Sequence, residues 1–141
     1  LAEAVDAAHA RHGHVIHIDC HSMPAVAGSH ATEFPGMAHA DFVVGDRDGS
    51  TASPALSQMI VEHLKDLGYS VGYNHPYKGV ELVRRHSDPT HQCHSIQLEI
   101  NRKLYMDEQT LAITSGFAPL QQHLRGLVER LLRTDPRALA L

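Results

Sequence analysis

The sequence predicts an α/β protein built on a mixed, largely parallel sheet, and two observations support this prediction. Short runs rich in β-branched residues alternate with segments of helical periodicity, and the order of elements is αβ-βαβ-βα. Strands separated by helices are typical of layered α/β folds. The chain has 141 residues, of which 43% are hydrophobic and 20% charged, so it can bury a core as one domain.

The composition excludes several classes of partner. The formal net charge is −4 and no basic run stands out, so no nucleic-acid partner is expected. No apolar run approaches the roughly 18 residues that a membrane-spanning helix needs. The two cysteines, Cys20 and Cys93, do not make a disulfide framework, and we expect them to be buried free thiols in a reducing cytoplasm.

The first part of the chain predicts a helix, a strand and a long loop. Apolar residues at helical spacing predict a helix over residues 1–12, and Gly13 stands where a glycine typically ends a helix. Residues 14–21 are rich in β-branched side chains and predict a strand. Residues 22–40 contain prolines and glycines with little periodicity, which predicts a loop long enough to be functional or mobile.

The middle of the chain predicts two further strands around a helix. Residues 40–46 read as a short buried strand. Ser53 and Pro54 are a strong helix start, because serine caps the N-terminus well and proline suits the first helical position. Apolar residues keep helical spacing as far as Gly68, and residues 69–74 predict the next strand.

The last part of the chain predicts an irregular segment, a strand and an amphipathic helix, in that order. Residues 77–93 are irregular, with room for one helical turn. Residues 94–102 follow as a strand, and residues 116–133 form an amphipathic helix that ends before Pro136.

The strand over residues 94–102 organises the rest of the chain. Apolar and polar side chains alternate along it, so they fall on opposite faces. The polar face carries Glu99 between the amides of Gln97 and Asn101, without a lysine. Such a face suits a strand that faces solvent, and it also suits a strand that borders a polar pocket.

Polar side chains also lie at the C-terminal end of the strand over residues 14–21. Asp19 and His21 lie at its C-terminal end, and Glu99 and Asn101 lie toward the C-terminal end of the later strand. Ligands of open α/β sheets collect at the carboxyl ends of strands. Both pairs therefore meet at one edge of the sheet if the two strands run parallel.

These residue types suggest a metal-assisted hydrolase, and each also has a simpler interpretation. His21 is a candidate zinc ligand that Asp19 would orient, or a strand-end histidine bonded to the following loop. Glu99 is a candidate general base toward a metal-bound water, or a carboxylate paired with Arg102 or Arg84. Arg84 and Arg85 could clamp a substrate carboxylate, or belong to a solvated surface.

Four motifs follow one another across roughly residues 10–110. They are Asp19-Cys20-His21-Ser22-Met23-Pro24, Gly45-Asp46-Arg47, Asn74-His75-Pro76-Tyr77-Lys78-Gly79 and Gln97-Leu98-Glu99-Ile100-Asn101-Arg102-Lys103-Leu104-Tyr105-Met106-Asp107-Glu108. In this order and spacing they resemble the N-formylglutamate amidohydrolase family. Each motif is weak alone, but the four together are specific.

The resemblance implies a three-layer α/β/α fold of the zinc carboxypeptidase-like group, around a mixed sheet. Family members hydrolyse an amide next to glutamate or a similar acid, and the formyl enzyme releases formate and glutamate in histidine degradation. The expected substrate is thus a small N-acyl amino acid, and the expected cofactor is Zn2+. By the resemblance, His21 matches the third zinc ligand, and Glu99 matches the glutamate that activates the zinc-bound water. Arg84 or Arg85, with Asn101, would bind substrate.

The family's other two ligands, a His and a Glu, are expected in an N-terminal half, and no residue before position 14 matches them. We therefore expect the chain to be the C-terminal part of an amidohydrolase about twice as long, with an incomplete metal site and no activity in isolation. Two alternatives stay open. One is a related deacylase or desuccinylase of N-acyl amino acids, and the other is a non-catalytic binding protein that kept the fold.

Overall fold

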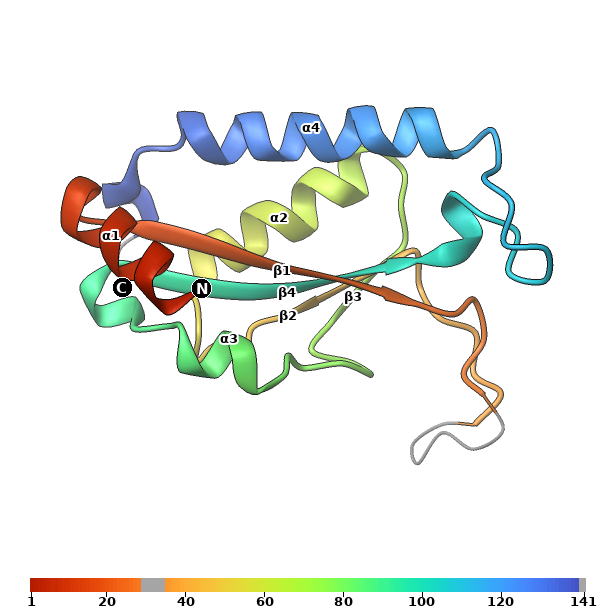
Figure 1. Ribbon diagram of the computed structural model, residues 1–141, viewed down its shortest axis with the longest axis horizontal. Helices are drawn as coiled ribbons and strands as arrows, with labels where there is room; N and C mark the ends of the chain where they lie inside the picture. Colours follow the sequence, from red (N-terminus) through yellow and green to blue (C-terminus); the bar gives the residue numbers. More distant parts are fainter. Residues whose placement is uncertain (29–34, 140–141) are drawn as a thin grey trace.

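The computed structural model describes residues 1–28 and 35–139 and centres on a four-stranded mixed sheet (Figure 1). The strands are β1 (Val15–Met23), β2 (Phe42–Gly45), β3 (Val71–Tyr73) and β4 (Cys93–Asn101), in the order β1-β4-β2-β3. β4 pairs parallel with β1 and antiparallel with β2, and β2 pairs parallel with β3. The predicted α/β class with a mixed, largely parallel sheet is therefore confirmed.

Helices cover both faces of this sheet. α2 (Pro54–Asp66) and α4 (Phe117–Arg133) lie together over one face, and the short α3 (Glu81–Arg85) lies on the other (Figure 1). α1 (Ala2–His12) precedes β1 and packs at its start. Three short 3₁₀ helices complete the elements: Pro89–His91, Arg102–Leu104 and Pro136–Leu139. The arrangement has the three layers that were expected.

The hydrophobic core lies between the sheet and the pair α2 and α4. It is made by alternate residues of β2 and β4 and by one stripe of each helix, and each side chain that is fully buried in it contributes about 1.5–3 kcal/mol. Its buried members are Phe42, Val44, Ala52, Leu56, Ile60, Leu64, Ile96, Leu98, Leu120, Leu127 and Leu139. Because side chains alternate along a strand, the polar residues of β4 face the opposite side, toward α3.

Local signals in the sequence set the helix ends. The Ser53 hydroxyl accepts a hydrogen bond from the main-chain N–H of Leu56 at 3.3 Å, and Pro54 is the first residue of α2, as predicted. Gly13 ends α1 with a φ of 72°, a conformation that other residues seldom adopt. β1 runs to Met23, beyond the predicted end at residue 21. The extension follows from pairing, because β4 continues opposite it.

A buried carboxylate fixes the turn after β2. Asp46 accepts hydrogen bonds from the hydroxyls of Ser57 and Tyr73, both at 2.5 Å. It also accepts from the Asn74 amide at 2.7 Å and the Gly49 main-chain N–H at 2.8 Å. Burial opposes ionisation of Asp46, but these four donors outweigh it and lower the pKa of the carboxyl group. Asp46 thus ties α2, β3 and the turn to the end of β2.

The predicted loop over residues 22–40 is only partly described, because residues 29–34 lie outside the described residues. Within the described part, Val26 and Ala38 form an isolated antiparallel bridge. None of the helices within residues 1–28 and 35–139 has both the length and the apolar composition to cross a bilayer.

The two thiols are free, as expected, but their burial differs from the prediction. Cys93 is half-buried, whereas Cys20 is exposed. The prediction of a buried thiol is wrong for Cys20, because β1 is the edge strand of the sheet that residues 1–28 and 35–139 form, and most of its side chains are only partly buried.

Candidate active site

The polar face of β4 is buried, not solvated. Ser95 and Asn101 are fully buried, and Gln97 and Glu99 are 2% and 6% exposed. The segment before α3 covers this face, since the main-chain N–H of Val80 donates to the Gln97 side-chain oxygen at 2.9 Å. Of the two interpretations left open by the alternating pattern, a face exposed to solvent is wrong, because protein covers the polar side chains of β4.

Strand pairing brings the predicted residues together. β1 and β4 are parallel neighbours, with His21 opposite Glu99 and Asp19 opposite Gln97 in the register. The Nδ1 atom of His21 lies 3.7 Å from the Oε1 atom of Glu99. The two strand ends therefore form one constellation, as the sequence predicted for parallel strands.

His21 is held in one orientation by its neighbour on the strand. Its Nε2–H donates to the Oδ2 atom of Asp19 at 3.1 Å. Because an ionised carboxylate only accepts hydrogen bonds, Nε2 carries a proton, and in the neutral form of the ring Nδ1 keeps a lone pair. The His21 side chain is 38% exposed, whereas that of Asp19 is 12% exposed. A histidine with a carboxylate behind it and a bare nitrogen in front is the usual arrangement of a metal ligand.

Glu99 is fixed by the amide of Gln97. The Nε2 atom of Gln97 donates to Oε1 of Glu99 at 2.7 Å. The amide cannot turn around, because its oxygen already accepts from the main-chain N–H of Val80. Burial raises the pKa of Glu99, although His21 and Gln97 act in the opposite direction. A carboxyl group with a raised pKa suits proton transfer near neutral pH.

The predicted alternative for Glu99, an ion pair with arginine, is absent from the described residues. The guanidinium of Arg102 donates to the hydroxyl and the main-chain oxygen of Ser22. That of Arg84 pairs with Glu81 on the same helix. Among the described residues, the Glu99 carboxylate is therefore bonded by the Gln97 amide and not by an arginine.

Within the described residues, none of the predicted substrate-binding residues is bonded to His21 or Glu99. Arg84 and Arg85 are exposed on α3, and Arg84 is occupied by Glu81. Asn101 is fully buried, and its amide donates to the main-chain oxygens of His39 and Ala40. Asn101 therefore anchors the segment before β2, and the substrate-binding role of these three residues stays a prediction.

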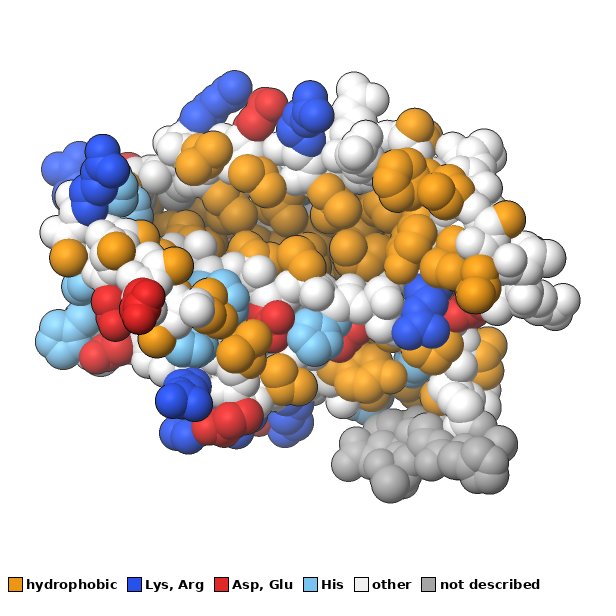
Figure 2. All heavy atoms as spheres, in the orientation of Figure 1, with side chains coloured by type: hydrophobic (Ala, Val, Ile, Leu, Met, Phe, Trp, Pro, Cys, Tyr) orange, Lys and Arg blue, Asp and Glu red, His pale blue; other side chains and the backbone are white. Residues whose placement is uncertain are grey.

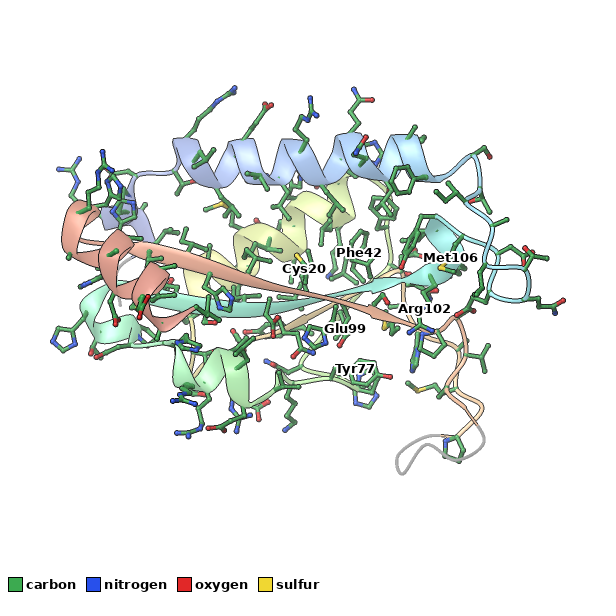
Figure 3. All side chains as sticks on the ribbon, viewed as in Figure 1. Cys20, Phe42, Tyr77, Glu99, Arg102 and Met106 are labelled. Atoms are coloured by element: carbon green, nitrogen blue, oxygen red, sulfur yellow. The ribbon has the colours of Figure 1, made fainter. Side chains whose placement is uncertain are left out.

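Two aromatic residues complete the surroundings of Glu99, and the sequence did not single them out. His39 donates from Nδ1 to the main-chain oxygen of Pro24 at 2.7 Å and meets Tyr77 edge to face, with 5.5 Å between ring centroids. Burial and then the charge of Glu99 raise the pKa of Tyr77. Figure 3 shows Glu99 and Tyr77 on the side of the sheet opposite α2 and α4. No periodic pattern marks His39, which lies in the long loop.

The residues present fit one position of a zinc site. His21 offers an oriented imidazole, and catalytic zinc normally takes three protein ligands and one exchangeable position. Within residues 1–28 and 35–139, no group of three or more His, Cys, Asp or Glu side chains is arranged to hold a metal ion. Among the described residues, His21 alone could therefore fill one position of such a site.

Comparison with known proteins gives consistent matches. The sequence model of the N-formylglutamate amidohydrolase family matches residues 1–106. An N-formylglutamate deformylase of Pseudomonas aeruginosa is 29% identical over 135 residues, which are 95% of this chain and 48% of that protein. One of Pseudomonas putida is 30% identical over 95 residues, which are 65% of this chain and 36% of that protein.

A solved structure agrees with the sequence matches. The crystal structure of N-formylglutamate amidohydrolase from Ralstonia eutropha JMP134 is 42% identical in sequence and superposes with a TM-score of 0.86. The match covers 93% of this chain and 48% of that one. The chain thus spans about half the length of the Pseudomonas aeruginosa and Ralstonia relatives.

Proposed function

Because this chain belongs to the N-formylglutamate amidohydrolase family, we propose that it supplies one side of an active site that hydrolyses N-formyl-L-glutamate to formate and L-glutamate. The single observation that carries this proposal is the register of β1 and β4, which sets His21 against Glu99. The names of the Pseudomonas and Ralstonia relatives support the substrate. The two free thiols are consistent with a reducing cytoplasm as the setting.

His21 is proposed to hold a zinc ion through Nδ1, with Asp19 fixing the ring through Nε2. The other protein ligands would come from the part of the amidohydrolase that this chain does not match. When bound, zinc supplies Lewis-acid polarisation of the amide carbonyl and of water.

Glu99 is proposed to move the proton. Its carboxylate accepts a proton from the attacking water as the new C–O bond forms at the formyl carbon. It then donates that proton to the nitrogen of glutamate as the C–N bond breaks, so formate and a free amine leave. Gln97 keeps the Oε1 atom of Glu99 in place during both steps. The raised pKa of Glu99 favours the second step, because a carboxyl group that holds its proton longer can deliver it to the leaving nitrogen.

The test uses a chimera in which this chain replaces the matched half of the Ralstonia amidohydrolase, with formate release from N-formyl-L-glutamate as the assay. Glu99→Gln keeps the shape and removes the base, so kcat should fall about 10²–10⁴-fold while zinc content and folding change little. Glu62→Gln, an exposed carboxylate on α2, is the matched control and should keep full activity.

A second variant separates the metal from the base. His21→Ala should lower the zinc content first and activity through it, because one oriented ligand is lost. Near-normal turnover of the Glu99→Gln chimera would mean that the carboxylate is structural, and the proposed proton transfer would be wrong. If the chimera held a full complement of zinc and had a native circular dichroism spectrum but were inactive, N-formyl-L-glutamate would not be the substrate.

A further inference from the structure

Two of the four sequence motifs take no part in the proposed proton transfer, yet they lie against each other. They are the motifs over residues 45–47 and 74–79. The main-chain N–H of Arg47 donates to the carbonyl oxygen of Lys78 at 2.7 Å, and its guanidinium donates from Nη1 to the carbonyl oxygen of Gly79 at 3.0 Å. A single residue of the first motif thus holds two consecutive carbonyl groups of the second.

Residues 78–80, which we call the cover segment, connect these motifs to the candidate active site. The carbonyl group of Gly79 and the N–H of Val80 belong to one planar peptide group, so fixing the oxygen also fixes the direction of the N–H. That N–H donates to the side-chain oxygen of Gln97 at 2.9 Å, and the Gln97 amide donates to Oε1 of Glu99 at 2.7 Å. The position of this peptide group therefore determines how Gln97 and Glu99 are oriented.

The positive charge of Arg47 strengthens this connection. A cation that binds a carbonyl oxygen polarises the peptide group, and the N–H of the same group becomes a better donor. Val80 thus offers Gln97 a stronger hydrogen bond than an uncharged partner at Gly79 would allow.

The backbone around Arg47 is strained. Arg47 and Asp48 have φ values of 54° and 58°, and Asn74 in the second motif has a φ of 52°. Residues with a side chain seldom adopt this left-handed conformation, and such residues cluster at functional sites where the surrounding structure holds them. Asp46 supplies that support through its four hydrogen bonds. The turn held in this way presents both the N–H and the guanidinium of Arg47 to the cover segment.

A second contact between the turn and the cover segment is exposed to solvent. Nζ of Lys78 lies 2.8 Å from Oδ2 of Asp48, and the two side chains are 60% and 62% exposed. Figure 2 shows charged side chains of both signs gathered over the adjoining α3, a surface where water screens such pairs. Arg47 is only partly exposed and binds a main-chain oxygen. Its bond is therefore better suited than the ion pair to hold the segment.

We propose that Arg47 is a positioning residue for the proposed hydrolysis. It holds the cover segment against the end of β2, and through Val80 and Gln97 it keeps Glu99 in the orientation that proton transfer requires. The proposal rests on the proposed function of Glu99. Arg47 acts through other residues, so its loss affects the rate of the chemical step more than the binding of substrate.

Formate release by the chimera with the Ralstonia amidohydrolase tests this role. Arg47→Met keeps the length of the side chain and removes the donor, so kcat should fall about tenfold while KM changes less than about twofold. Arg47→Lys keeps a positively charged donor and should recover most of the lost rate. Arg125→Met replaces an exposed arginine of α4, and this matched control should keep full activity. Circular dichroism checks that each variant is folded.

A double variant tests the route through Gln97. Gln97→Met removes the hydrogen bonds to Val80 and Glu99, so adding Arg47→Met to it should lower kcat no further. If Arg47 and Gln97 acted independently, the two losses would multiply.

Hydrogen exchange in the 141-residue chain measures the cover segment without any assay of hydrolysis. The main-chain N–H of Val80 should exchange with deuterated water about tenfold faster in Arg47→Met, because its peptide group is held less firmly. The N–H of Asn101 donates to the carbonyl oxygen of Asp41 at 2.9 Å, at the other end of the β2 and β4 pair, and should keep its rate. NMR follows both rates in one sample.

Three results would overturn the proposal: unchanged exchange of the Val80 N–H in Arg47→Met, normal kcat despite faster exchange, or losses that multiply in the double variant. Failure of the proposed function would look different. A folded, zinc-loaded wild-type chimera that releases no formate refutes the hydrolysis, and the exchange of Val80 then still decides whether Arg47 holds the cover segment. An active chimera in which Arg47→Met turns over normally refutes the positioning role and leaves the function standing.

Discussion

At the scale of single residues, Asp46 shows how much structure one carboxylate can hold. Its four donors come from α2, from β3, from the residue after β3 and from the turn that follows β2. Burial, and then the hydrogen bond and charge of this carboxylate, raise the pKa of its partner Tyr73 to about 12. Removing the negative charge leaves several buried donors without a full acceptor, which is one of the more damaging changes a core can suffer.

We predict that Asp46→Asn lowers the free energy of unfolding by about 2–4 kcal/mol at pH 7. The pKa of Asp46 is lowered in the folded state, so its contribution is present above the unfolded pKa of about 3.9 and is lost as pH falls through the folded value. Urea denaturation at pH 7 and pH 3 measures this, and the difference between wild type and variant should shrink at pH 3.

The control for this prediction is Asp66→Asn, at the end of α2. Asp66 is exposed, so its replacement should change stability by no more than about 0.5 kcal/mol at either pH. A loss in Asp46→Asn that stays the same at pH 3 would mean that packing, not charge, dominates at this position.

Sequence patterns identify some of these residues and miss others for a physical reason. Glu99 and His21 stand at strand ends, where chemistry is expected, and the parallel pairing of β1 and β4 brings them together. The roles of Gln97 and Asp46 depend on partners that lie far away in sequence, such as Val80 for Gln97. No local period encodes such a contact, so only the folded chain reveals it.

At the scale of elements, local sequence signals predicted which helices and strands form. Tertiary contacts determined which of their faces are buried. The N-cap of α2 and the glycine that ends α1 are read directly from the chain. The burial of the polar face of β4 could not be read in this way, because alternation alone describes a solvated face equally well. That face is buried by a short segment, Lys78 to Val80, which approaches β2 closely at Gly45.

Gly45 tests this close approach. A Cβ atom at position 45 would lie 2.7 Å from the carbonyl carbon of Lys78 and 2.8 Å from the nitrogen of Gly79, and main-chain atoms cannot easily move away. We predict that Gly45→Ala lowers the free energy of unfolding by about 1–3 kcal/mol, as overpacked sites do. Urea denaturation provides the measurement.

Gly126 differs from Gly45 because there is room for a side chain at this position, which lies within a helix. No atom lies within 4 Å of the Cβ position at Gly126, and the residue is inside α4. Alanine should therefore raise the free energy of unfolding by about 0.5–1 kcal/mol through helix propensity alone. If the two variants changed stability in the same direction, steric contact with the Lys78 segment would not be the cause at Gly45.

At the scale of the whole molecule, the hydrophobic core and the proposed metal site differ in how much of each the described residues contain. The described residues form a core of their own between the sheet and two helices, yet they bring together no set of three metal-binding side chains. Folding and metal binding should therefore be separable properties. These residues make the core, whereas the zinc site proposed above would need ligands from outside them.

We predict that the 141-residue chain folds alone but retains far less than one zinc per chain after dialysis, because catalytic zinc normally needs three protein ligands. Elemental analysis measures the retained metal, and circular dichroism follows the fold. The chain alone should also release no formate from N-formyl-L-glutamate. Stoichiometric zinc that is lost in His21→Ala would contradict this prediction.

The register between β1 and β4 also determines which changes of length the chain can accept. His21 and Glu99 are 78 positions apart in sequence but directly opposite each other in the sheet, since the strands are aligned residue by residue from Val15 and Cys93 onward. Inserting many residues into the loop after Pro24 leaves this alignment intact. Deleting a single residue between Val15 and His21 turns the imidazole to the other face of the sheet, away from Glu99. In this family, loops should therefore vary freely in length, whereas these two strands should tolerate substitutions but not a one-residue insertion or deletion.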